Sequence, residues 1–83
     1  MDYAIYKTIN GSRAHVVHRF TQADNNHQAK RAAQEKLKEM WLRIVRYGFG
    51  NKRIEGSKPY EFSYDYIAAE GLTQRIRFYI AAL

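Results

Sequence analysis

The feature that most constrains the fold is a long amphipathic pattern over residues 28–47. Apolar residues recur there at steps of three and four, which places them on one stripe of an α-helix. The stripe consists of Ala29, Ala33, Leu37, Met40, Trp41, Ile44 and Val45. Thr21 or Asp24 can cap the start of this helix, and Gly48 marks its end. We therefore predict one helix over residues 25–47 and a sheet that covers its apolar stripe.

Residues 3–20 are predicted to form a β-hairpin around Asn10-Gly11, because a type I′ turn requires positive φ at both central residues. A two-residue loop sets Ile5 opposite Val16. On that register one face carries Tyr3, Ile5, Ile9, Ala14, Val16 and Phe20, and the other carries Tyr6, Thr8, Arg13, His15, Val17 and Arg19. The first face is apolar, so we expect it to lie against the helix.

Residues 60–82 form the second predicted hairpin. A three-residue loop over 69–71 sets Asp65 opposite Arg75, whereas a two-residue loop would mix polar and apolar residues on each face. Gly71 then occupies the left-handed position of a turn with a bulge. The core face carries Tyr60, Phe62, Tyr64, Tyr66, Leu72, Ile76, Phe78 and Ile80, and the outer face carries Glu61, Ser63, Asp65, Ile67, Thr73, Arg75, Arg77 and Tyr79.

The connection over residues 48–59 is polar and contains glycine, so we predict a loop, with a short irregular strand near Lys52–Glu55 as an alternative. The element order is therefore ββαββ. The predicted fold class is α+β, a four-stranded, mostly antiparallel sheet with one long helix packed on one face. With 83 residues, the chain is expected to form a single domain, 1–83, with one core.

Composition excludes several functional classes. Without cysteine there is no disulfide framework and no thiolate zinc site. The first residues do not resemble a signal peptide and no apolar run reaches membrane-span length, so we expect a cytoplasmic protein without membrane contact. The histidines lack metal-ligand spacing, and no nucleophile or paired acid and base stands out. We therefore expect no enzyme activity, no catalytic residue, no metal and no cofactor.

The net charge of +6 attracts polyanions and acidic surfaces. On the predicted registers, arginine and tyrosine side chains gather on the sheet face that the helix leaves open. Arginine donates to phosphate and tyrosine offers a flat surface to a base. The candidate binding residues are Tyr6, Arg13, His15, Arg19, Arg75, Arg77 and Tyr79, with Lys52 and Arg53 from the loop. The alternative is an ordinary solvated sheet in which Asp65–Arg75 and Glu61–Tyr79 are cross-strand pairs.

The helix carries six basic residues against two acidic ones on its polar side. Arg31–Glu35 and Glu39–Arg43 have the spacing of ion pairs, so we interpret this side as a solvated surface. Leu42 lies off the apolar stripe and is a candidate contact for a partner or for the 48–59 loop.

The passage from Phe20–Asp24 into Gln28–Ala33 goes from a strand to a capped, alanine-rich basic helix. It resembles the strand-to-helix passage of some small phage-encoded anti-CRISPR proteins. That resemblance implies a stoichiometric inhibitor of a CRISPR–Cas complex and adds Lys30 and Arg31 to the candidate binding residues.

The expected partner is therefore a nucleic acid, DNA or RNA, or a nucleoprotein complex. The alternative is a protein-interaction inhibitor that binds an acidic protein surface. Open edge strands also leave a sheet-extended homodimer as an alternative.

Overall fold

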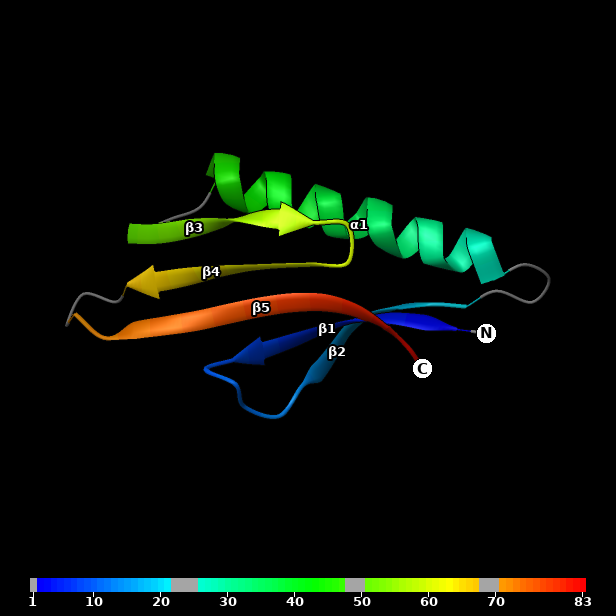
Figure 1. Cartoon of the computed structure of the whole chain (residues 1–83), viewed down its shortest axis with the longest axis horizontal. Helices are drawn as coiled ribbons and strands as arrows, with labels where there is room; N and C mark the ends of the chain where they lie inside the picture. The colour runs from blue at the N-terminus through cyan, green and yellow to red at the C-terminus, as the bar shows by residue number, and fades with distance from the viewer. Residues whose placement is uncertain (1, 22–25, 48–50, 68–70) are drawn as a thin grey trace.

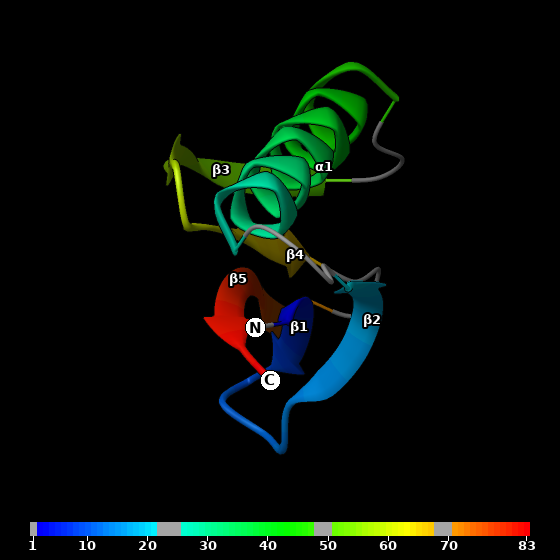
Figure 2. The same ribbon diagram turned by 90° about the vertical axis from the view of Figure 1, so that its right-hand side faces the viewer.

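The computed structural model describes residues 2–21, 26–47, 51–67 and 71–83, with the backbone alone for 26–27, 47 and 51–57. The elements are β1 (Tyr3–Ile9), β2 (His15–Phe20), α1 (Asn26–Tyr47), β3 (Asn51–Lys58), β4 (Glu61–Ile67) and β5 (Thr73–Ala82). The strands form one antiparallel sheet of order β2-β1-β5-β4-β3, and α1 lies along one side of it (Figures 1 and 2). The predicted α+β class, with an antiparallel sheet and one long helix, is confirmed.

All four predicted strands are present, and β3 joins them within the segment that was predicted to be a loop. Its backbone pairs with β4 from Asn51 opposite Ile67 to Lys58 opposite Glu61, with a bulge between Ile54 and Ser57. The segment lacks a regular apolar alternation, so its sequence gives only a weak strand signal. Pairing with β4 stabilises this segment, because the hydrogen bonds between the two strands satisfy backbone groups of β3 and of the outer edge of β4.

The helix termini proposed from sequence fall partly outside this description. Asp24 and Gly48, the candidate start and stop signals, lie outside the described residues. The helix itself begins at Asn26 and ends at Tyr47, close to the predicted range of 25–47.

The register of the second hairpin is confirmed. Asp65 lies opposite Arg75 and Phe62 opposite Phe78. Gly71 has φ +81°, the left-handed conformation that a glycine adopts at little cost. Residues 69 and 70 of the predicted 69–71 loop lie outside the described part of the chain. Because β5 also pairs with β1, it is the central strand of the sheet.

The first hairpin has the predicted turn. Asn10 and Gly11 have φ of 54° and 71°, and the Ser12 N–H donates to the Ile9 carbonyl at 3.0 Å. Asn10 also binds the central strand. Its N–H donates to the carbonyl of Arg75 at 2.8 Å, and its Oδ1 accepts from the N–H of Arg75 at 2.8 Å.

The predicted register beyond this turn is wrong. Ile5 lies opposite His18 rather than Val16, and Val16 lies opposite Tyr6. The chain leaves β1 after the turn and rejoins it only at His15, and a bulge then leaves Val17 as an extra residue on β2. Val16 therefore lies on the face away from the helix, and His15 lies on the helix side, the reverse of the prediction.

The core lies between α1 and the three central strands. Leu37 packs in one buried cluster with Ile5, Phe62, Ile76 and Phe78. Partly buried side chains surround this cluster: Phe20, Met40, Trp41, Ile44, Tyr64 and Ile80.

Besides Val16, whose side differs from the prediction, five residues assigned to the core from sequence are instead exposed: Ile9, Val45, Tyr60, Tyr66 and Leu72. Val45 lies in the last turns of α1, and the other four lie next to chain reversals, at the end of β1, at the ends of β4 or just before β5. The periodicity is correct for these positions, but it does not show how far along each element the packing extends.

Two leucines on α1 allow the packing to be tested by matched substitutions. Leu37 is 2% exposed and Leu42 is 42% exposed. We expect Leu37→Ala to lower the free energy of unfolding by about 2–5 kcal/mol, because it leaves a cavity in the core. Leu42→Ala should cost about 1 kcal/mol or less. Urea unfolding followed by circular dichroism measures both, and equal losses would contradict this assignment of the core.

Candidate functional site

The sheet face away from α1 brings tyrosine and arginine side chains together from three strands. Tyr6 lies opposite Tyr79 across β1 and β5. Arg75 and Arg77 share the face of Tyr79 by alternation along β5. Arg19 joins them from β2, opposite Ala4. We call the surface formed by Tyr6, Arg19, Arg75, Arg77 and Tyr79 the tyrosine face.

The two tyrosines form the centre of this face. Their ring centroids are 5.3 Å apart and their planes are inclined by 17°, so the rings are stacked. The guanidinium carbon of Arg77 lies 4.7 Å from the centroid of Tyr79, within cation–π range. Both rings are partly exposed. Arg77, Tyr79 and Tyr6 therefore form a continuous set of flat groups at the surface.

Carboxylates from β4 hold both arginines of β5. Nε and Nη2 of Arg77 donate to Oε2 of Glu61, with the Nε bond at 3.0 Å. Nε of Arg75 donates to Oδ1 of Asp65 at 3.1 Å, which is the predicted Asp65–Arg75 pair. Glu61 lies opposite Tyr79 as predicted, but its carboxylate binds the diagonal neighbour, Arg77. These pairs fix the direction of the guanidinium groups and offset their charge.

The ion pair also changes the acidity of Glu61. The hydrogen bond from Arg77 holds the pKa of this carboxyl below its ordinary value of 4.5, and its slight burial opposes the shift. The charges of Arg77 and Lys58 lower the pKa further, and Lys58 Nζ lies 4.0 Å from the carboxylate.

The remaining basic residues predicted for the site do not all lie on the tyrosine face. Arg19 is exposed and makes no ion pair within the described part of the chain. Arg13 is also exposed, but it lies in the segment between the turn and β2. His15 does not belong to the tyrosine face, because β2 rejoins β1 one residue out of the predicted register, which sets His15 opposite Lys7 on the helix side.

Lys52 and Arg53 lie on β3, where the backbone sets them opposite Tyr66 and Asp65 respectively. The register therefore places Arg53 on the side of the tyrosine face, although its side chain lies outside the described part. Lys30 and Arg31 belong to α1, on the other side of the sheet. The Nζ of Lys30 lies 5.3 Å from the ring centroid of Tyr60.

The helix carries most of the unbalanced positive charge among the described residues. Glu39 lies 3.6 Å from both Lys36 and Arg43, so the predicted Glu39–Arg43 pair is present. The predicted pair of Arg31 with Glu35 is not formed, since no ion pair joins these two described side chains.

The sequence had identified the residues of the tyrosine face but not the role of Glu61. The signal in the sequence for this role was the position of Glu61 on the outer face of β4, diagonal to Arg77.

No group of three histidine, aspartate or glutamate side chains within the described ranges could hold a metal ion. Among those same residues, α1 is too polar to cross a lipid bilayer. Comparisons of the chain with protein-family models, curated proteins and solved structures gave no match. The local geometry is therefore the basis for assigning a function.

The Glu61–Arg77 pair predicts a pH dependence with a definite sign. Because the folded-state pKa of Glu61 is lowered, its stabilising contribution is present above pH 4.5 and is lost as the pH falls through the folded-state pKa. Carboxyl titration by NMR should give Glu61 a pKa below 4.5, and Arg77→Gln should raise it toward that value. Arg75→Gln is the control, because Arg75 binds Asp65. An identical Glu61 pKa in the wild type and Arg77→Gln would contradict the pairing.

Proposed function

We propose that this chain is a non-enzymatic protein that binds single-stranded nucleic acid, alone or within a nucleoprotein complex, through the tyrosine face. The observation that carries the proposal is the stacked pair of Tyr6 and Tyr79, with Arg77 against Tyr79, on the sheet side that α1 leaves uncovered. An exposed aromatic surface of this kind accepts unstacked bases of any sequence, since every base has a π-face. Bases within a duplex are already stacked, which favours single strands.

The Glu61–Arg77 hydrogen bonds support this use of the surface. They hold the guanidinium of Arg77 in one direction, so less side-chain entropy is lost when a base or phosphate binds beside it. Asp65 orients Arg75 in the same way. The consequence is a face that is ordered before the ligand arrives.

The same carboxylates limit the electrostatic part of the binding. Arg75 and Arg77 are offset by Asp65 and Glu61, which leaves Arg19 as the main unbalanced charge among the described side chains of this face. About one phosphate is therefore neutralised, which for a single strand gives a slope of log affinity against log salt of about −0.7.

A second candidate function is inhibition of a nucleoprotein complex by contact with its protein surface, as the resemblance to anti-CRISPR proteins implies. Its support is the near balance of charge on the tyrosine face, where two arginines meet two carboxylates. A surface with both signs of charge and two tyrosines is also suited to a protein contact. The two candidates differ in whether an isolated oligonucleotide binds.

The test is fluorescence anisotropy with labelled thymidine and uridine oligonucleotides of about 12 nucleotides, within the range of known single-strand site sizes. We expect Tyr79→Ala and Tyr6→Ala each to cost about 1–3 kcal/mol of binding free energy, or about 5- to 150-fold in affinity. Tyr60→Ala is the matched control, because Tyr60 is 52% exposed and lies outside the tyrosine face.

The outcomes separate the two candidates. Affinity that falls in the Tyr6 and Tyr79 variants, with the shallow salt slope given above, supports stacking on the tyrosine face. Absence of oligonucleotide binding even at low salt would reject nucleic-acid binding and favour the protein-contact alternative. Equal loss in the Tyr60 control would place the interaction elsewhere.

A further inference from the structure

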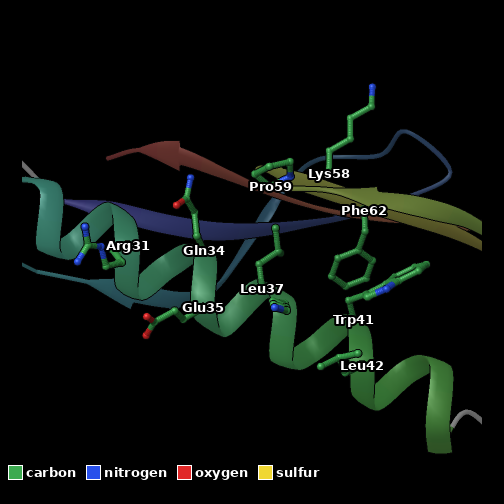
Figure 3. Close-up of a pocket in the computed structure, with 10 residues that line it drawn as sticks. Arg31, Gln34, Glu35, Leu37, Trp41, Leu42, Lys58, Pro59 and Phe62 are labelled. Carbon is green, nitrogen blue, oxygen red and sulfur yellow. The ribbon is translucent and has the colours of Figure 1, made fainter.

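A groove of about 510 Å³ lies between α1 and the β3–β4 turn, apart from the tyrosine face (Figure 3). It extends along the helix from Arg31 to Leu42, which corresponds to about 16 Å at the rise of an α-helix. Lys58, Pro59 and Phe62 form its opposite wall. The volume falls within the range of about 300–1,000 Å³ that is typical of ligand sites.

The floor of the groove is apolar and partly aromatic. The rings of Trp41 and Phe62 meet at 5.4 Å between centroids with an interplanar angle of 57°. Trp41 is only partly buried, and Leu42 is 42% exposed, although it projects from the middle of a helix. Figure 3 shows Leu37, Trp41 and Phe62 directed toward the space between helix and strand. This floor can bury a large apolar side chain.

The rim of the groove is predominantly cationic. Arg31 and Lys38 border it on the helix, against one carboxylate, Glu35. Lys58 lies at the turn, and Figure 3 shows its side chain directed away from the helix. Within the described part of the chain, neither Arg31 nor Lys38 takes part in an ion pair. The ammonium of Lys58 lies 4.0 Å from Glu61, which belongs to the other face of the sheet, and the Lys58 side chain is 77% exposed. An occupant with negative charge around an apolar anchor is therefore complementary to this site.

We propose that this groove is a docking site for an acidic peptide segment of a partner protein, with a large apolar residue packed on Trp41 and Leu42. Arg31 and Lys38 are seven residues apart on the helix, about 10 Å, which about three residues of an extended chain span at 3.3 Å each. A peptide with carboxylates on either side of an apolar residue can reach both cations, whereas a compact ligand with one anionic group cannot. The groove and the tyrosine face lie on different sides of the sheet, so both can be occupied together.

The test selects ligands from a displayed library of random peptides of about 12 residues, longer than the groove requires. We expect the selected sequences to place Asp or Glu around a large apolar residue. Binding of the synthetic peptides is followed through Trp41, the single tryptophan of the chain, whose emission should change on occupancy.

Substitutions in the groove test the contributions of its apolar floor and its cationic rim to peptide binding separately. Leu42→Asp should weaken peptide binding at least about tenfold by placing a like charge at the anchor site. Lys38→Glu should weaken it at least about fivefold, and the control Arg46→Glu, an exposed residue of the last helical turn, should change it by less than about twofold. Far-UV circular dichroism verifies that each variant is folded.

Three results would overturn the proposal. They are a library that yields no peptide dependent on Leu42, a basic rather than acidic consensus, and equal effects of the Lys38 and Arg46 variants. Decanoate serves as a small amphiphilic probe. If it changes Trp41 emission saturably while no selected peptide does, the groove is a small-molecule site rather than a peptide site.

Discussion

The packing of Leu37 against the apolar side chains of β1, β4 and β5 is the interaction on which the rest of the structure depends. Leu37, Ile5, Phe62, Ile76 and Phe78 are buried together, and they join the helix to the three central strands. An 83-residue chain has room for one such cluster, so the helix can cover only one face of the sheet. The tyrosine face is exposed as a direct consequence. The groove lies alongside this cluster, between the helix and the β3–β4 turn, and Leu37 and Phe62 line it.

Positive charge and stacking surface are separated in this fold. The basic surplus of the described residues lies mainly on α1, whereas the arginines of β5 are each bound to a carboxylate of β4. Ion pairs at such exposed positions contribute about 1 kcal/mol or less to stability. Their main effect is on geometry, because Glu61 holds Arg77 beside Tyr79. The tyrosine face is thereby suited to flat ligands more than to a dense array of phosphates.

Elements governed by their own hydrophobic pattern were predictable, and elements governed by distant pairing were not. The helix and the β4–β5 register follow from periodicity, because a slip of one residue would expose the core face. The one-residue shift between the Asn10-Gly11 turn and β2 has no signal in the sequence, and it places His15 on the helix side. The bulge at Val17 then returns Arg19 to the predicted side. Strand β3 depends on the open edge of β4. Tyr6 and Tyr79 lie on one face as predicted, since the alternation of β1 and β5 continues without interruption. Their contact depends on the pairing of β1 with β5, which the sequence left open. The Glu61–Arg77 contact is diagonal, and a register of directly opposite residues does not reveal it.

The most direct test of the central claim, that the face left open by the helix is the binding surface, is an NMR titration of the protein with a uridine oligonucleotide. Binding at this face should change the chemical shifts of Tyr6, Arg19, Arg77 and Tyr79, and should give nuclear Overhauser contacts between base protons and the two tyrosine rings. Resonances of Leu37 and the helix should remain in place. Shift changes concentrated on α1, with the tyrosine rings unaffected, would contradict the account.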